Sequence, residues 1–552
     1  MSSVLPAAAA ARTGLAIVVR ALAGGGSLVR DYHAGLHLEP FFGGHPGDID
    51  AYVRKAAEVD VRLGGAQRMR VAAAIEPLGD ATHRLRSILD GNGYFITTGQ
   101  QPALFGGPLY TLYKVLAAVQ LADALEGRLG KPCLALFWIG ADDHDWDEAN
   151  HTHVIGARDY LQRLQVSAPA DAAPVPMHER AWGGGVLRAV DELLGQLPQT
   201  VWARAVAEHV RDTYVPTATV AASFTATMRW LLDGQRVALV SSAHPLLRRA
   251  ALPVLRREAE RVREHAAAIA RQTARLEAAG YRAQVALADG ASNIMLLEET
   301  GRDRLLRTGA GWVTRRDRLA MHDDALRALL DAHPERFSPN VLLRPVVENA
   351  VFPTIAYVAG PAEVSYFAQI GCLFAEHGIA PPVVVPRRSV TLVEPAIARV
   401  LARLELDADA LRLPFDQLLG ELTRRQLPDR LRAALRDARA ALLREYETLT
   451  EAALTVDASL RGPLTTARNE ALQRLHHAEQ KILRQLRRRN AVSAEQLRRA
   501  ATHLQPGGAP QERMLSPLHY VAHYGPAFVD EVRASLDMSP VPVAQWRGPQ
   551  CA

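Results

Sequence analysis

Five short apolar runs, each bounded by turn residues, predict the buried strands of one sheet. They read YFIT, CLALFWI, VALVSS, TIAYVAG and PVVVP, and they occupy residues 94–97, 133–139, 237–242, 354–360 and 382–386. Helical patterns of apolar residues follow most of these runs or join them. Because strands that alternate with helices form parallel βαβ units, the pattern predicts an α/β fold with a doubly wound parallel sheet.

Two segments do not follow this alternation. Residues from about 155 to 235 have mostly helical periodicity, whereas residues 281–318 are typical of a small β-meander with Gly turns. We interpret both as insertions into a core that runs from residue 1 to 394, the second insertion extending to about residue 335.

The last third of the chain has a different pattern. Over residues 395–505 apolar residues recur at spacings of three and four among many charges, with a break at RGP, residues 461–463. This pattern predicts a coiled-coil hairpin of two long antiparallel helices, able to pair with a second copy. Its many Arg residues would suit nucleic acid, but Glu and Asp balance them, which favours a solvated face. The final segment, 506–552, is predicted to pack back on the core.

Composition narrows the class of protein. The 552 residues carry a formal net charge of +5 with acids and bases interspersed, so no nucleic-acid partner is expected. No apolar run is long enough to span a membrane, and the Ala-rich start has no basic region of a secretion signal. Three cysteines without CxxC spacing suit a reducing compartment. We therefore expect a cytoplasmic protein that does not bind membranes.

The loop after the first predicted strand is one candidate for ligand binding, because ligands of doubly wound sheets bind beyond the carboxyl ends of the strands. It reads TTGQQPALFGGPLYTLYK and leads into a helix that starts near Pro108. Glycines and a helix N-terminus favour an anion, either phosphate or carboxylate. Lys114 would add a point charge or lie on the surface. The candidate residues are Thr98, Gly99, Gln100, Gln101, Gly107, Tyr110 and Lys114.

The loop after the second strand, GADDHDWDEANHTH at residues 140–153, is acidic. Clustered carboxylates raise one another's pKa, and they would make His144 more basic, which suits general-base chemistry. Asp143, His144 and Asp145 are the candidate catalytic residues. The alternatives are a metal site, a pocket for a polar substrate or ATP–magnesium, and a helix N-terminus with acidic caps only. Since the spacing matches no standard zinc pattern, we expect no tightly bound metal.

Later loops add polar residues at the same predicted edge of the sheet. His244 would cap a helix or bind a ligand, and Arg344 would clamp a carboxylate or phosphate, or form an ion pair. Arg387 follows the last strand, where it could meet a polyphosphate. The full set is His244, Asn340, Arg344, Gly360, Glu363, Tyr366 and Arg387. Together these loops predict a pocket for a polar, partly anionic small molecule.

Several long motifs occur in the order found in one known family. TTGQQPALFGGPLYTLYK, FWIGADDHDWDEANHTHV, FSPNVLLRPVVENAVFPTIAYVAGPAEVSYFAQ and PQERMLSPLHYVAHYG, with LVRDYHAG and PFF before them, resemble the cysteine ligase family of bacillithiol biosynthesis, the BshC family. The resemblance implies a Rossmann-like nucleotidyltransferase core with inserted connecting segments. It also implies a C-terminal coiled coil that forms a homodimer.

The resemblance implies that the protein adds L-cysteine to glucosaminyl-malate to form bacillithiol. Activation of the carboxylate by ATP with Mg²⁺ is a hypothesis, because no HIGH-type or KMSKS-type signature is present. On this interpretation the Gly99–Gln101 turn and the helix near Pro108 hold a phosphate or a malyl carboxylate, and Asp143, His144 and Asp145 orient or deprotonate the amine. Arg344, Glu363 and Arg387 complete the polar wall of the pocket. The alternatives are a metal-dependent hydrolase or amidase acting on a small polar conjugate, and a non-catalytic coiled-coil scaffold.

Overall fold

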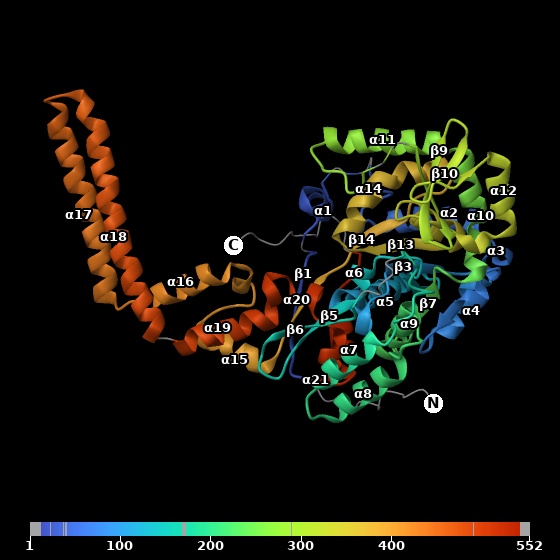
Figure 1. Cartoon of the computed structure of the whole chain (residues 1–552), viewed down its shortest axis with the longest axis horizontal. Coiled ribbons are helices and arrows are strands. Elements are labelled where there is room, and N and C mark those ends of the chain that lie inside the picture. The colour runs from blue at the N-terminus through green and yellow to red at the C-terminus, as the bar shows by residue number, and fades with distance from the viewer. Residues whose placement is uncertain are drawn as a thin grey trace. The chain divides into compact units, whose positions relative to one another are not determined.

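The structure, a computed structural model, consists of two compact units (Figure 1). It describes residues 13–22, 24–36, 38, 41–167, 173–286, 288, 290–489 and 491–540. One unit comprises the described residues of Met1–Leu392 and Glu512–Ala552, and the other those of Val393–Gln511. The Ala-rich start of the chain, Cys551 and the end of the predicted C-terminal segment lie outside the described residues.

The first unit is built on a six-stranded sheet in the order β14-β13-β3-β4-β7-β2. All five predicted strands are present, and each is parallel to its neighbours among the five. The sixth strand, β2, is antiparallel to β7 and was not predicted, because three residues are too few to show an alternation. The strands are β2 (Ile75–Pro77), β3 (Tyr94–Gln100), β4 (Cys133–Ile139), β7 (Val237–Ser241), β13 (Thr354–Ala359) and β14 (Val383–Pro386). The predicted doubly wound α/β fold is confirmed.

The strand order reverses beside β3. From β3 the chain continues to β4 and β7 on one side of the sheet, and then to β13 and β14 on the other side. In such a sheet the loops after the two strands at the reversal separate and leave a crevice. The crevice therefore lies between the loops that follow β3 and β13.

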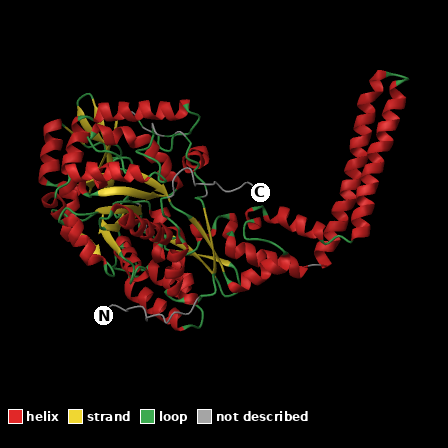
Figure 2. Ribbon diagram, turned by 180° about the vertical axis from the view of Figure 1, so that it is seen from behind, coloured by secondary structure: helices red, strands yellow, loops and turns green. Residues whose placement is uncertain are grey.

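Both faces of the sheet are buried, which explains why its strands are continuous apolar runs. Along β4, Cys133, Ala135, Phe137 and Ile139 belong to one hydrophobic cluster, and Leu134, Leu136 and Trp138 belong to the other. This is the alternation of a strand whose successive side chains point to opposite faces. Figure 2 shows helices surrounding the strands of this unit.

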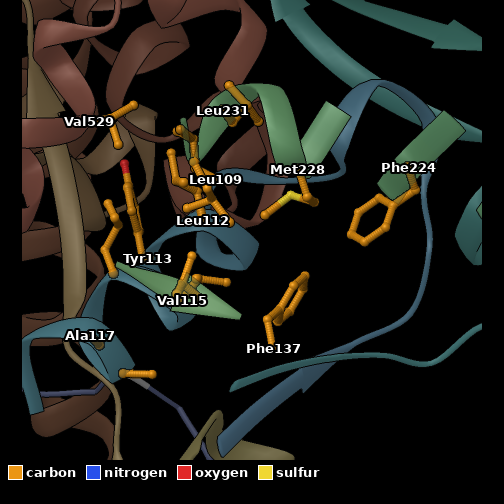
Figure 3. Packing of buried hydrophobic residues seen from close by; sticks show 14 of the residues in the cluster. Leu109, Leu112, Tyr113, Val115, Ala117, Phe137, Phe224, Met228, Leu231 and Val529 are labelled. Carbon is orange, nitrogen blue, oxygen red and sulfur yellow. The ribbon is translucent and has the colours of Figure 1, made fainter. Parts of the chain in front are cut away.

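Helix α5 (Leu109–Leu129) packs on the first face of the sheet, together with α9 (Val220–Leu231) and α22 (Ala527–Ser535). Figure 3 shows Leu109, Leu112, Tyr113 and Val115 of α5 near Phe137 of β4, with Phe224, Met228 and Leu231 of α9 and Val529 of α22. Residues from widely separated parts of the chain thus share one core.

Other helices cover the second face. These are α1 (Gly26–His33), α4 (Ala81–Leu89), α10 (Pro245–Glu260), α11 (Val262–Ala278), α13 (Arg344–Val351) and α14 (Pro361–Glu376). The N-terminal part of the chain also contains α2 (Ile49–Arg62) and α3 (Gly65–Met69), and β1 (Ala16–Arg20) forms a two-stranded sheet with β15 (Ser389–Val393).

The segment predicted as a helical insertion begins with a β-hairpin, which corrects that prediction. After the short helix α6 (Trp146–Ala149), β5 (His151–Ile155) pairs antiparallel with β6 (Leu161–Gln165), and α7 (Gly185–Leu194), α8 (Val201–Thr213) and α9 follow. Thr152 and Val154 are buried while His151 and His153 are partly exposed. The alternation was therefore in the sequence, but it is too short to stand out from the helical pattern that follows.

The second insertion is a five-stranded antiparallel sheet, as the β-meander pattern predicted. Its order is β11-β10-β9-β8-β12, and α12 (Asp323–Ala332) lies between its last two strands in sequence. The first strand begins at residue 291 rather than near 281. The strands are β8 (Ala291–Glu298), β9 (Gly301–Thr308), β10 (Gly311–Thr314), β11 (Ala320–Met321) and β12 (Phe337–Pro339).

The second unit is helical, and a long hairpin of α17 and α18 dominates it (Figure 1). The predicted break at 461–463 is displaced: the turn is formed by residues 455–460, and Gly462 and Pro463 lie in the first turn of α18, where Pro is tolerated. No residue of α17 is buried. The helices are α15 (Pro395–Leu404), α16 (Phe415–Arg425), α17 (Asp429–Leu454), α18 (Arg461–Arg489) and α19 (Ala491–Leu504).

The C-terminal segment belongs to the first unit, where α21 (Pro517–Tyr524) contacts α8 and α22 contacts α5. Just before α21, in α20 (Gln511–Met514), Glu512 accepts hydrogen bonds from Arg387 at 2.8 and 3.0 Å. It also accepts from the N–H of Val390 at 3.0 Å. Arg387 and Glu512 are both buried, so each charge depends on the other for stability. Among the described residues, no helix is long and apolar enough to cross a membrane.

Replacing Glu512 with Ala should strongly destabilise the first unit, because Arg387 would keep a buried charge without its carboxylate. Removing one partner of a buried ion pair costs about 3–5 kcal/mol. Urea denaturation followed by tryptophan fluorescence measures this change in the free energy of unfolding. The exposed Glu299 provides the control Glu299→Ala, which should change stability by less than about 0.5 kcal/mol. An equal loss of unfolding free energy in the two variants would show that the pair of Arg387 and Glu512 does not stabilise the unit.

Candidate functional site

A cavity of about 550 Å³ lies at the carboxyl edge of the sheet, at the reversal of strand order. The loops after β3, β4, β7, β13 and β14 all contribute to its wall. The inserted antiparallel sheet adds Met295, Arg302 and Arg304, and the C-terminal segment adds Arg513. The core loops, the inserted sheet and the C-terminal segment therefore build one pocket.

Most of the residues predicted from the loops line this cavity. They are Gly99, Gln100, Gln101, Tyr110, Lys114, Asp143, His144, Asn340, Arg344, Gly360, Glu363, Tyr366 and Arg387. The convergence of these loops follows from the parallel sheet, since the carboxyl ends of its strands share one edge.

The structure does not bring four predicted residues to the cavity wall. Thr98 is fully buried and donates to the carbonyl of Val358 at 2.8 Å, so it links β3 to β13. Asp145 accepts from the N–H of Glu148 at 3.1 Å and caps α6. His244 caps α10 in the same way. Gly107 has φ 70° and forms the turn before α5, a conformation that favours Gly.

The N-terminus of α5 is less open to an anion than its sequence predicted. The N–H of Leu109 donates to the carbonyl of Leu515 at 2.9 Å, and that of Thr111 donates to Pro108 at 2.9 Å. These two donors are therefore already used by the protein. Pro108 and Thr111 instead line a smaller cavity of about 230 Å³, which shares Gln100, Gln101, Tyr110, Glu148 and Arg513 with the larger one.

Lys114 is part of a buried ion pair rather than a free charge. Its Nζ donates to Glu363 at 2.7 Å and to the carbonyl of Gly99, and only 2% of its surface is exposed. Glu363 also accepts from the Tyr357 hydroxyl and from the N–H of Gly360, each at 2.6 Å. Burial alone would raise the pKa of Glu363, but Lys114 and these hydrogen bonds lower it. These contacts tie the end of β3 and the start of α14 to α5.

Arg344 and Arg387 are neutralised in the same way. Arg344 donates to the buried Glu348 at 2.8 Å and to the hydroxyls of Tyr357 and Tyr366 at 3.1 and 3.0 Å. Arg387 is held by Glu512. The alternative of a structural ion pair therefore applies to Arg344, although both side chains still face the cavity.

Three arginines that the sequence did not predict lie in this cavity and form no ion pair with a described carboxylate. Arg302 donates to the Ser338 hydroxyl at 3.0 Å and to the carbonyl of Pro339 at 2.8 Å. In the described part of the chain, neither it nor Arg304 or Arg513 forms an ion pair with a carboxylate within 4.0 Å. Arg302 and Arg304 stand two apart on β9, so they share one face of that strand. This spacing of two is the sequence feature that could have grouped Arg302 with Arg304. It does not indicate which cavity that face of the strand borders.

Carboxylates lie in the same cavity. Asp143 accepts from the Gln101 side chain at 2.6 Å and from the N–H of His144 at 2.7 Å. Partial burial, with the charges of Asp143 and Asp145, raises the pKa of Glu148. Asp142, by contrast, is paired with Arg248. The cavity thus offers cations without acidic partners together with carboxylates, an arrangement that suits a ligand carrying both signs of charge.

His144 is less basic than its acidic neighbours predicted. Burial and then Arg302 lower its pKa, and these effects outweigh the opposite effects of Asp143 and Asp145. Its Nδ1 lies 3.9 Å from Asp143 Oδ1 and has no hydrogen-bond partner among the described residues. The expectation of a more basic His144 is therefore wrong, because burial of the ring and then Arg302, which comes from an insertion, lower its pKa, and the local sequence reveals neither.

Two family models match consecutive parts of the chain. Residues 25–388 match the N-terminal Rossmann-like domain of bacillithiol biosynthesis BshC, and residues 390–539 match its C-terminal coiled-coil domain. The chain belongs to the BshC family. Together with the observed sheet and hairpin, these matches confirm the Rossmann-like and coiled-coil assignments.

Relatives in the BshC family match along most of their length. A protein of Salinibacter ruber is 32% identical over 460 residues, 82% of each chain. One of Symbiobacterium thermophilum is 31% identical over 512 residues, covering 89% of this chain and 91% of the relative. One of Bacillus cereus is 27% identical over 462 residues, covering 82% and 85%. Each is named "Putative cysteine ligase BshC".

For this BshC-family chain, the His144 imidazole should titrate below its ordinary pKa of 6.5. NMR of the imidazole protons, assigned by comparison with His144→Gln, measures the midpoint. Arg302→Gln should raise that midpoint, because it removes a nearby cation, whereas Arg158→Gln at an exposed position should leave it unchanged. A midpoint at or above 6.5 in the unaltered protein would show that the carboxylates dominate instead.

Proposed function

We propose that this cavity joins L-cysteine to glucosaminyl-malate in the cytoplasm, which forms bacillithiol. The observation that carries the proposal is the charge of the cavity in a BshC-family chain. Arg302, Arg304 and Arg513 form no ion pair with a described carboxylate, and Asp143 and Glu148 lie in the same wall. Malyl carboxylates need cations, and the ammonium groups of cysteine and of the amino sugar need carboxylates. Family membership and charge thus support the same substrates.

The reaction forms an amide between the cysteine carboxyl and the sugar amine. We propose that ATP, with Mg²⁺, is the co-substrate that activates the carboxyl. The carboxylate would attack the α-phosphorus and release pyrophosphate, and the amine would then attack the acyl carbon and release AMP. The amine must lose a proton to become a nucleophile. Arginines without acidic partners would suit the phosphates as well as the carboxylates, so the cavity has charges compatible with this co-substrate.

The residues of the cavity would divide these tasks. His144 would accept the amine proton, because its lowered pKa keeps the imidazole neutral at neutral pH. Asp143, held by Gln101, would orient the ammonium group of a substrate before it loses its proton. The buried pairs of Lys114 with Glu363 and of Arg344 with Glu348 would hold the wall rigid.

The alternative of a metal-dependent hydrolase has less support. Within the described residues, no three His, Cys, Asp or Glu side chains of this cavity bring ligating atoms within 4.8 Å of one another. A catalytic zinc site generally needs three protein ligands. We therefore propose the ligase.

Purified protein incubated with cysteine and glucosaminyl-malate should form bacillithiol only when ATP and Mg²⁺ are present. Mass spectrometry of the product and of released AMP measures turnover. Equal product formation without ATP would exclude adenylation, and absence of product under all conditions would contradict the ligase proposal.

In the same assay, His144→Gln should lower kcat by about 10²–10⁴-fold, the usual effect of losing a general base. The matched control is His333→Gln, at an exposed position that does not line the cavity, which should keep the original rate. If His144→Gln were as active as that control, His144 would not be the base.

We also propose that α17 and α18 form a homodimer with a second copy. Leu443 and Leu449 on α17 are 39% and 50% exposed, and no residue of this helix is buried within the chain. A second hairpin would cover these apolar side chains.

The double variant Leu443→Arg and Leu449→Arg should therefore sediment as a monomer under conditions where the unaltered chain is a dimer. Analytical ultracentrifugation measures the mass, and circular dichroism checks that the helices remain. A monomer formed by the unaltered chain at all concentrations would contradict this arrangement.

A further inference from the structure

Three side chains with metal-binding groups meet away from the cavity. Glu258 lies on α10, His265 lies on α11, and His377 directly follows α14. Their ligating atoms all lie within 4.8 Å of one another. Glu258 and His265 are completely buried, and the two imidazole rings are 4.9 Å apart between centroids. None of the three lines the cavity described above.

Hydrogen bonds determine how the His265 ring is oriented and protonated. Glu258 accepts from the backbone N–H and the side-chain amide of Asn293 at 2.9 Å each, and its other oxygen lies 2.6 Å from Nδ1 of His265. A carboxylate in that position accepts a hydrogen bond from Nδ1–H, so Nε2 of a neutral His265 carries a lone pair. Carboxylates orient metal-binding histidines in this way.

One nitrogen of each ring lacks a hydrogen bond to the described residues. Nε2 of His265 and Nε2 of His377 are both buried, and neither is hydrogen-bonded to a described residue. Leaving a buried polar atom unsatisfied costs free energy, and an ion or an ordered water is the usual explanation. Since one ligating atom of each of the three residues lies within 4.8 Å of the others, a single bound ion can reach this cluster.

The surrounding charges restrict what that ion can be. Arg257 and Arg261 act electrostatically on His377. A histidine binds a metal through its neutral imidazole. The positive charges of these arginines repel a bound cation. A cation that binds here must therefore form strong bonds to the histidine nitrogens. Zn²⁺ and similar transition metals do so, whereas Mg²⁺ and Ca²⁺ prefer oxygen.

We propose that Glu258, His265 and His377 form a binding site for Zn²⁺ or a similar divalent transition metal. His265 and His377 ligate the ion through Nε2, Glu258 orients His265, and water completes the coordination on the partly exposed side of His377. The bound ion links α10, α11 and the end of α14. The sequence predicted no tightly bound metal because these residues are 7 and 112 positions apart in turn and no spacing rule connects them. The site is independent of the proposed ligase function.

Metal titration of the full chain, freed of its affinity tag and dialysed against chelator, tests the proposal. When ZnCl₂ is added, the unaltered protein should bind one more equivalent of Zn²⁺ per chain than His377→Ala binds. Calorimetry and metal analysis after gel filtration measure this number. Because His377→Ala keeps every other zinc-binding residue, the difference between the two proteins counts only the zinc bound at this site. CoCl₂ should give a visible absorption spectrum that His377→Ala lacks, and MgCl₂ should give no difference.

Two further variants make the result specific. His333→Ala removes an exposed histidine and should bind like the unaltered protein. Glu258→Gln should weaken zinc binding about 10–100-fold, the usual effect of losing a residue that orients a ligand. Zinc should also raise the thermal unfolding midpoint of the unaltered protein and not that of His377→Ala. Identical zinc binding by the unaltered protein and by His377→Ala would overturn the proposal, and so would no bound zinc in either.

Discussion

The burial of the parallel sheet on both faces is the constraint on which the rest of the structure depends. Each central strand needs apolar side chains in both directions, so helices must cover both faces, and polar residues are left to the loops at the strand ends. Because the five strands are parallel, the loops after them lie at one edge. The reversal of strand order beside β3 then separates two of these loops and makes room for the cavity.

Charge pairing decides which residues of that cavity are available to a ligand. Lys114, Arg344 and Arg387 are each held by a carboxylate. The pair of Lys114 joins α5 to the start of α14, that of Arg387 joins the end of β14 to the C-terminal segment, and that of Arg344 lies within α13. The cations without acidic partners come instead from the inserted sheet and from Arg513. The core therefore supplies a rigid frame, whereas an insertion and a distant segment supply the charges that would bind a substrate.

Sequence periodicity predicted the elements that have long, strong patterns. The five strands and the α17–α18 hairpin were found because each buries or repeats enough apolar residues to be recognised. Short elements were missed: β2 has three residues, and the hairpin of β5 and β6 precedes a longer helical segment. Among site residues, Gln101, Asp143 and His144 were found because a strand end and the loop that follows it are adjacent in sequence.

The sequence by itself determined the α/β class, the order of the strands along the chain and the family, because these depend on local apolar patterns and on long motifs. Only the tertiary structure decided which charges are paired. Lys114 meets Glu363 across 249 positions, and Arg302 lowers the pKa of His144 from a different sheet. The grouping of Glu258, His265 and His377 was decided in the same way. Electrostatic interactions depend on distance in space, which sequence separation does not report.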